Sequence, residues 1–328
     1  MRIHLSRRSL LGAGIALATP FLAGQARAAA WPERPLRLII PYPPAGGTDA
    51  ISREVAHRIT EIAGWTVVTE NRSGAGGNIG LDLVAKSDPD GYTIGMGQTA
   101  NLAINPSLYP TMPFNPLRDL APVSTVAQQP NLLIVRKDAP WKDLEALITD
   151  ARKRPGALNV GHSGAGTTGH LSGEMFAAQA GIEMVVVPYV GAAPVLTDLL
   201  AGRIDLFFVN PLAARGVLEA GSMRVLAVTS PQRMRAMPAI PTVAELGFPG
   251  YEAVNWTGVV APANTPAAQI MALNKVIRQV LQHPAVVARL AAEGSEPLGS
   301  APEEFAAFLR TENVKWGRVV KEAKVVVN

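Results

Sequence analysis

Four glycine-containing turns carry the residue types in this chain that could bind or react with a small molecule. Each turn follows a short apolar run and precedes a helical pattern, which places the free backbone N–H groups of a helix N-terminus at its end. Such groups attract anions, and glycines let a ligand approach the backbone closely. Glycine is also the ordinary way for a chain to leave a strand. The four turns lie at residues 41–49, 71–78, 161–168 and 188–194.

The first turn, P-Y-P-P-A-G-G-T-D, follows an apolar run at 38–40 that is typical of a buried strand. Its prolines hold the chain extended, and Gly46 and Gly47 are expected to adopt backbone angles that other residues avoid. Thr48 is predicted to cap a helix over 49–62, because apolar residues recur there at helical spacing. The segment therefore predicts a strand, a glycine turn and a helix start that attracts anions.

The third turn also contains a candidate nucleophile. G-H-S-G-A at 161–165 resembles the G-x-S-x-G elbow of serine hydrolases, and Ser163, Asp205 and His283 occur in serine–acid–histidine order. An elbow turns directly into a helix at its serine, whereas here Gly164, Gly166 and two threonines intervene. We therefore expect no enzyme, and an exported serine hydrolase that uses Ser163 is the alternative.

Two further kinds of site have weaker signals. G-M-G-Q-T-A at 95–100 fits the dinucleotide fingerprint, but Pro106, Pro110 and Pro113 follow where its helix should run. The chain has five histidines without a recognisable ligand spacing and has no cysteine, so thiolate metal sites, disulfides and thiol catalysis are excluded. We expect no cofactor and no metal.

The N-terminus has the pattern of an export signal. Arg7 and Arg8 precede an apolar run over 10–22, and A-R-A at 26–28 fits a cleavage site, so residues 1–28 are predicted to be a twin-arginine-like signal. Cleavage after Ala30 is the other option. The run is short and is interrupted by two glycines and a proline, which argues against a membrane anchor. The protein is therefore expected to be periplasmic.

Charge and composition limit the classes of partner. Of 328 residues, 48% are hydrophobic and 17% are charged, as in a globular protein with a sizeable core. Removal of the signal takes four arginines and no acidic residue, so Lys and Arg fall from 30 to 26 against 26 Asp and Glu. A mature chain with no net charge and no basic cluster gives no support to nucleic-acid binding.

Strand-like runs alternate with helical patterns, which favours α/β sheets with buried, mainly parallel strands. Extended segments at 127–136 and 255–265 look like crossings between two lobes joined by a hinge. The predicted lobes are 29–130 plus 257–328 and 131–256, with a ligand cleft between them. The expected strands are 38–40, 66–69, 92–96, 132–135, 158–160, 184–187, 204–208, 225–229 and 257–261, and the expected helices are 49–62, 80–86, 141–153, 171–180, 194–201, 267–281, 285–293 and 303–322.

Seven segments follow one another in a characteristic order: I-I-P-Y-P-P-A-G-G-T-D (39–49), E-N-R-S-G-A-G-G-N-I-G (70–80), P-D-G-Y-T-I-G (89–95), G-H-S-G-A-G-T-T-G-H-L-S-G-E (161–174), V-P-Y-V-G-A-A-P-V-L-T-D-L-L-A-G-R-I-D (187–205), P-T-V-A-E-L-G-F-P-G-Y-E (241–252) and W-T-G-V-V-A-P-A-N-T-P (256–266). Together they resemble the solute receptors of tripartite tricarboxylate transporters, the Bug-type periplasmic binding proteins. The resemblance implies a two-lobed Venus flytrap, type II-like, which closes on a small carboxylate and delivers it to membrane subunits. A monomer is expected.

The resemblance also implies which residues contact the ligand, through backbone N–H groups, hydroxyls and waters. Arg72 could add charge from the rim, and Asp205 could instead cap a turn or bond across the hinge. The ligand could be a di- or tricarboxylate, an acidic amino acid or an aromatic carboxylate, and the role could be transport or sensing. The candidate ligand-binding residues are Tyr42, Ala45, Gly46, Gly47, Thr48, Asp49, Thr99, Asn101, Ser163, Gly164, Thr167, Thr168, Tyr189 and Asp205.

Overall fold

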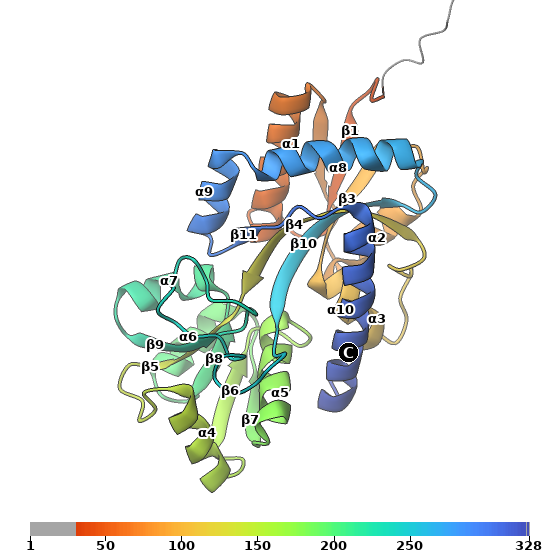
Figure 1. The fold of residues 1–328 in the computed structure, drawn as a ribbon. Coiled ribbons are helices and arrows are strands. Elements are labelled where there is room, and N and C mark those ends of the chain that lie inside the picture. The colour runs from red at the N-terminus through yellow and green to blue at the C-terminus, as the bar shows by residue number, and fades with distance from the viewer. Residues whose placement is uncertain (1–30, 326, 328) are drawn as a thin grey trace, which may run out of the picture. The chain divides into compact units, whose positions relative to one another are not determined.

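The computed structural model describes residues 31–325 and 327, and the predicted export signal lies outside them. Two β-sheets organise the unit Arg34–Asn328 (Figure 1). The first lobe is built on the six-stranded sheet, in the order β11-β4-β10-β3-β1-β2, and the second on the five-stranded sheet, in the order β7-β6-β8-β5-β9. The predicted two-lobed α/β fold is confirmed, whereas the predicted lobe boundaries remain a proposal.

The first sheet contains β1 (Leu36–Ile40), β2 (Val67–Asn71), β3 (Thr93–Gln98), β4 (Leu120–Pro130), β10 (Val254–Pro262) and β11 (Glu296–Pro297). The second contains β5 (Leu132–Arg136), β6 (Leu158–His162), β7 (Met184–Pro188), β8 (Leu206–Val209) and β9 (Met223–Val228). The helices of the first lobe are α1 (Gly47–Ala63), α2 (Asn78–Ala85), α3 (Asn105–Leu108), α8 (Ala267–Leu281), α9 (Pro284–Ala292) and α10 (Pro302–Ala323), with short turns η1 (Ala75–Gly77) and η2 (Ala100–Ile104). The second lobe has α4 (Leu144–Lys153), α5 (Thr168–Ala180), α6 (Ala192–Leu200) and α7 (Pro211–Glu219).

The prediction of mainly parallel sheets is wrong. Strand β1 pairs in parallel with β2 and β3, and β6 does so with β7 and β8. The strands that lead from one lobe to the other pair differently, because β10 is antiparallel to both β3 and β4, and β5 is antiparallel to both β8 and β9. A chain that enters a sheet from the other lobe has no need of a helical crossover, so antiparallel neighbours are accessible to it.

The lobes are joined at Asn131, which lies between β4 and β5. Its backbone N–H donates to the Thr229 hydroxyl at 2.8 Å, and its carbonyl accepts from the Thr229 N–H at 3.0 Å. The Thr229 hydroxyl in turn donates to the Ala253 carbonyl at 2.6 Å. Strand β10 begins at Val254 and pairs with β3 and β4 of the first sheet, so the segment predicted to cross at 255–265 overlaps this strand. The limits of the second crossing stay a prediction.

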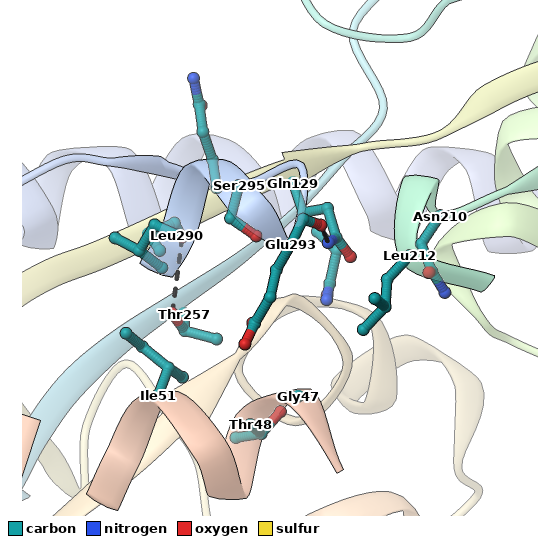
Figure 2. A pocket seen from close by; sticks show the side chains of 13 residues that line it. Gly47, Thr48, Ile51, Gln129, Asn210, Leu212, Thr257, Leu290, Glu293 and Ser295 are labelled. Atoms are coloured by element: carbon teal, nitrogen blue, oxygen red, sulfur yellow. Dashed lines mark hydrogen bonds between the residues drawn. The ribbon is translucent and has the colours of Figure 1, made fainter. Parts of the chain in front are cut away.

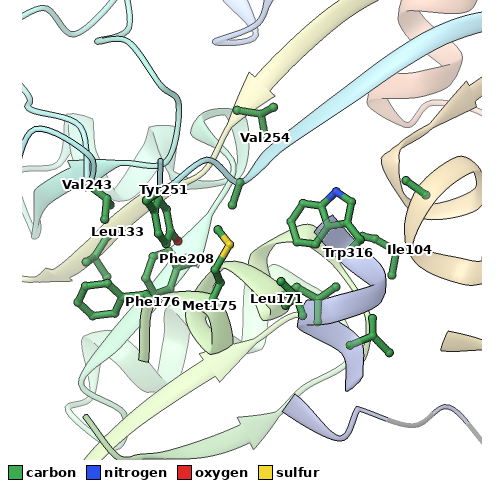
Figure 3. Close-up of a cluster of buried hydrophobic side chains, with 14 of the residues drawn as sticks. Ile104, Leu133, Leu171, Met175, Phe176, Phe208, Val243, Tyr251, Val254 and Trp316 are labelled. Atoms are coloured by element: carbon green, nitrogen blue, oxygen red, sulfur yellow. The ribbon is translucent and has the colours of Figure 1, made fainter. Parts of the chain in front are cut away.

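A shared apolar cluster continues behind this junction (Figure 3). Trp316 of α10 and Ile104 of η2 belong to the same buried cluster as Leu171 and Met175 of α5. Helix α10 also packs against η2 and β4, while α1 packs against α8. Burial of this apolar surface stabilises the contact between α5 of the second lobe and α10 of the first.

Candidate functional site

The first glycine turn is held in place by Asp49 at the start of α1. Its carboxylate accepts hydrogen bonds from the Ala45 N–H at 3.0 Å, from Asn71 Nδ2 at 2.8 Å and from Arg53 Nε at 3.0 Å. The Arg53 guanidinium, helped by Asn71 and Ala45, lowers the pKa of this carboxyl from 3.8 to about 2, although burial opposes the shift. Asp49 is 4% exposed, so its side chain shapes the turn from inside the first lobe.

The backbone of this turn differs from the prediction in two ways. Gly46 is the N-cap of α1, with φ −83° and ψ 166°, so the prediction of Thr48 as N-cap is wrong. The left-handed residue is Ala45, with φ 66°, whereas Gly46 and Gly47 lie outside that region. A Cβ added to Gly47 would meet nothing within 4 Å. Gly47 is therefore not required by local geometry, and it leaves its backbone open to an approaching molecule.

The second glycine turn is mostly exposed, and its buried end at Gly77 and Asn78 contacts the first turn within the first lobe. The Tyr42 hydroxyl donates to the Gly76 carbonyl at 3.2 Å and accepts from Asn101 Nδ2 at 3.1 Å, and burial raises the pKa of Tyr42. A Cβ on Gly77 would press against both side chains. Arg72, a candidate rim charge, donates to Glu70 Oε1 at 2.6 Å. The second turn therefore supports the first one through the Tyr42 side chain.

In the second lobe, two stacked histidines hold the turn that follows β6. His162 Nδ1 accepts from the Gly164 N–H at 3.2 Å, and His170 Nδ1 accepts from the Gly166 N–H at 3.1 Å. The ring centroids are 4.0 Å apart and the rings are inclined by 16°. Thr167 caps α5, because its hydroxyl accepts from the His170 N–H at 3.3 Å.

The fourth turn uses its polar groups within the second lobe. The Tyr189 hydroxyl donates to Asp198 Oδ2 at 2.7 Å, and Arg203 donates to the other oxygen of that carboxylate at 2.8 Å. Asp205 accepts from the backbone N–H of Asn159 in strand β6 at 2.8 Å, so its carboxylate is hydrogen-bonded within the second lobe. Ala192, the first residue of α6, lies at the edge of the cleft described next.

Two adjoining cavities, each of about 210 Å³, form a cleft between the lobes. They share three amide side chains, those of Gln129, Asn210 and Asn255. The first cavity (Figure 2) is lined by Gly47, Thr48, Ile51, Ala127, Gln128, Gln129, Asn210, Leu212, Asn255, Thr257, Leu290, Glu293 and Ser295. The second is lined by Gln98, Ala100, Gln129, Asn131, Ser163, Thr167, Thr168, Gly169, Ala192, Phe207, Phe208, Val209, Asn210 and Asn255.

The starts of four helices of at least eight residues meet at this cleft: α1 at Gly47, α5 at Thr168, α6 at Ala192 and α7 at its N-cap Asn210. Among the described residues, no Lys or Arg lines either cavity, and Glu293 is the charged group. Figure 2 shows the Glu293 side chain reaching into the cavity toward the start of α1. The cleft therefore offers helix dipoles, hydroxyls and amides to a ligand rather than cationic side chains.

The structure brings together only some of the candidate residues. Gly47, Thr48, Ser163, Thr167 and Thr168 line the cleft. Ala45 and Gly46 are exposed in the turn that leads to it. The other candidate residues form hydrogen bonds within one lobe, Gly164 through its backbone N–H to His162 and the rest through their side chains. They are Tyr42, Asp49, Thr99, Asn101, Gly164, Tyr189 and Asp205.

Sequence reasoning missed the amides that line the cleft. Gln129, Asn131 and Asn255 lie in or beside the strands at the junction, and Asn210 follows β8. Their signal was available, since residues just beyond strand ends and in a crossing segment face the gap between lobes. It was overlooked because an amide has no distinctive spacing.

The residues considered for a serine hydrolase and for a metal site are not arranged for either chemistry in the part of the chain that the structure describes. Asp205 accepts from Asn159 and His283 Nδ1 accepts from the Ala285 N–H, so neither serves Ser163 as a triad partner here. Across residues 31–325 and 327, no group of three His, Asp or Glu side chains is arranged to hold a metal ion. Within the same residues, no helix has both the length and the apolar character to cross a membrane.

Comparison with known proteins gives a consistent result. The model of a family described as "Tripartite tricarboxylate transporter family receptor" matches residues 51–325. Protein BugT of Bordetella pertussis is 38% identical over 316 residues, which cover 96% of this chain and 97% of BugT. An R. palustris protein solved with adipate is 40% identical with a TM-score of 0.76, covering 90% of this chain and 99% of that one. MatC from Rhodopseudomonas palustris, with bound malate, is 28% identical with a TM-score of 0.72, covering 88% and 100%.

These matches extend over both lobes and both sides of the cleft. The chain belongs to the tripartite tricarboxylate transporter receptor family, whose members are periplasmic solute-binding receptors and not enzymes.

Proposed function

We propose that this protein is an exported receptor that captures a small carboxylate in the cleft between its lobes and delivers it to the membrane subunits of a tripartite tricarboxylate transporter. The observation that carries this proposal is the meeting of the starts of α1 and α5, one from each lobe, at a cleft that no Lys or Arg of the described residues lines. Helix starts attract carboxylates, and charge-assisted hydrogen bonds to hydroxyls and amides strengthen the attraction.

The arrangement favours a ligand that reaches both lobes. A molecule with an acidic group at each end could contact the α1 start near Thr48 and the α5 start near Ser163. Only such a bridging ligand gains contacts on closure, so it would favour the closed state over the open one. Adipate and malate, found in two similar proteins, have this character.

Thermal unfolding of the mature protein with adipate, malate, citrate, glutamate and benzoate tests this function. A ligand at a hundred times its Kd should stabilise the protein by about 2.7 kcal/mol and so raise Tm by a few degrees. Calorimetry should then show tighter binding of a dicarboxylate than of the monocarboxylate of equal length. No response to any of the five, or equal affinity for mono- and diacids, contradicts the proposal.

Variants of the cleft locate the binding site. Ser163→Ala and Thr48→Val remove one hydroxyl from each side and should weaken the binding of a responsive dicarboxylate by about tenfold each, as expected for one charge-assisted hydrogen bond. Thr197→Val is the matched control, since its hydroxyl is on α6 and donates to the Ala193 carbonyl. Unchanged affinity in both cleft variants would place the ligand elsewhere.

A further inference from the structure

Two histidines with no direct place in the cleft lie immediately beneath its second-lobe turn. His162 ends β6 and His170 is in the first turn of α5, and they are 5% and 8% exposed. Buried polar groups are costly unless they are hydrogen-bonded. Each ring meets this need by accepting a backbone N–H from the turn between them, at 3.2 Å from Gly164 and at 3.1 Å from Gly166.

These bonds define the protonation state of both rings. An Nδ1 atom that accepts a hydrogen bond carries no proton, so each neutral imidazole has its proton on Nε2. His170 Nε2 lies 3.5 Å from Glu174 Oε1, which suits an Nε2–H. Burial, and then the neighbouring His170 ring, lower the pKa of His162 from 6.5 to about 4, so it stays neutral at ordinary pH.

Few charged groups lie beside the two histidine rings. A small cavity beside the rings is lined from β6, α5 and β7 by Val160, Gly161, Gly169, Gly173, Ala177, Met184 and Val186. Glu174 is the acidic group that faces the rings among the described residues of these elements. Apart from Glu174, the residues of this cavity wall bring no charged group to the stacked rings.

We propose that His162 and His170 are positioning residues of the ligand-binding turn: their Nδ1 atoms hold the Gly164 and Gly166 amides and so fix the direction in which the Ser163 and Thr167 side chains face the cleft. The proposal rests on the proposed carboxylate capture. The two N–H groups are then not available to the ligand, and the Thr167 hydroxyl already donates to the Gly164 carbonyl at 2.8 Å. The second lobe's remaining donors are the Ser163 and Thr168 hydroxyls and the N–H groups at the start of α5.

Two substitutions of His162 separate an acceptor from a packing role. His162→Asn keeps a side-chain oxygen that can accept from the N–H two residues on, as in an Asx turn. His162→Phe keeps a flat ring for stacking but accepts no hydrogen bond. At pH 7.5 we expect adipate affinity, measured by calorimetry, to stay within about threefold in His162→Asn and to fall about tenfold in His162→Phe. A packing role predicts the reverse order, which would overturn the proposal.

Measurements without ligand keep the test independent of the proposed function. Nitrogen NMR of histidine at pH 7.5 should show both rings with a proton on Nε2 and none on Nδ1. Amide exchange at Gly164 should be slow in the wild type and in His162→Asn and should be fast in His162→Phe. The exposed His57, 59% accessible on α1, gives the control variant His57→Phe, which should change neither readout.

The outcomes separate the two proposals. If adipate fails to bind the wild type while the NMR pattern holds, the positioning role stands and adipate is excluded as ligand. A proton on Nδ1 of either ring, or fast Gly164 exchange in the wild type, overturns the positioning role whatever binds. Lowering the pH through about 4, where folded His162 gains its proton, should release the Gly164 amide in the wild type but not in His162→Asn. A wild type whose Gly164 exchange shows no such change would also contradict the positioning role.

Discussion

The two turns that face each other across the cleft are fastened by opposite chemistry. In the first lobe, the Ala45 N–H donates to the charged carboxylate of Asp49, which also bonds to Arg53 and Asn71. In the second lobe, two turn amides donate to the uncharged ring nitrogens of the histidine pair. In both lobes, a buried side chain of the neighbouring helix or strand holds the turn's own amides.

This difference sets how each side responds to acid. The Asp49 carboxyl keeps its charge down to a pKa of about 2, because Arg53 stabilises the ionised form. His162 loses its acceptor at a pKa of about 4, because burial defers its protonation only that far. As the pH falls, the second-lobe turn should therefore loosen before the first-lobe turn does.

Removing the Asp49 carboxylate should have the largest effect on stability. Asp49→Ala takes away the hydrogen bonds from three donor groups, although water can still solvate the half-exposed Arg53. We expect the free energy of unfolding, from urea titration at pH 7, to fall by about 2–3 kcal/mol. Asp138→Ala is the control, because its pair with Arg136 is exposed and its loss should change stability by less than about 0.5 kcal/mol. Equal effects in the two variants would show that Asp49 does not fasten the turn.

The buried His162 should make the free energy of unfolding depend on pH. Unfolded His162 takes up a proton near pH 6.5, whereas the folded residue resists until about pH 4. The unfolded state thus binds more protons in this window, so stability should fall as the pH is lowered from 6.5 toward 4. At pH 4.5 the wild type should have lost roughly 2–3 kcal/mol more than His162→Asn, measured by urea unfolding. Parallel curves for the two proteins would argue against a buried, neutral His162.

Exchanging the left-handed residues of the turns should give smaller effects of opposite sign. Ala45 has φ 66°, and Gly166 has φ 71° with Leu108 of α3 directly against it. Gly166→Ala should lower the free energy of unfolding by about 1–2 kcal/mol, whereas Ala45→Gly should leave it unchanged or raise it by about 0.5 kcal/mol. Thermal unfolding measures both. Destabilisation by Ala45→Gly would mean that the first turn does not strain its alanine.

Most elements could be predicted from the sequence because their patterns are local. The helix expected over 303–322 is α10 (Pro302–Ala323), and the run at 132–135 is β5. Strand β4 was missed because its A-P-V-S-T-V-A-Q-Q-P sequence has prolines and no clear alternation. Strand direction was mispredicted because it depends on partners such as β10, more than a hundred residues away along the chain.

The candidate site could be predicted in outline but not in detail. The turns that border the cleft were found because glycines and hydroxyls between strand and helix are visible in any sequence. Which side chains face the ligand was not visible: Asn101 bonds to Tyr42, and Asn210 lines the cleft, although both are asparagines beyond strand ends. Burial distinguishes them, and burial is set by neighbours that are distant in sequence.

The sequence by itself determined the alternating elements, the glycine turns and the family to which the chain belongs, because periodicity and turn chemistry are properties of consecutive residues. Only the tertiary structure decided that Asp49 fastens the first turn and that His162 and His170 stack beneath the second. It also decided that amides from the junction strands complete the cleft. The amides come from segments far apart in the sequence, whereas Asp49 and the two histidines act on turn residues close to them in the chain. In each case, burial in the low-dielectric interior determines which polar groups must pair.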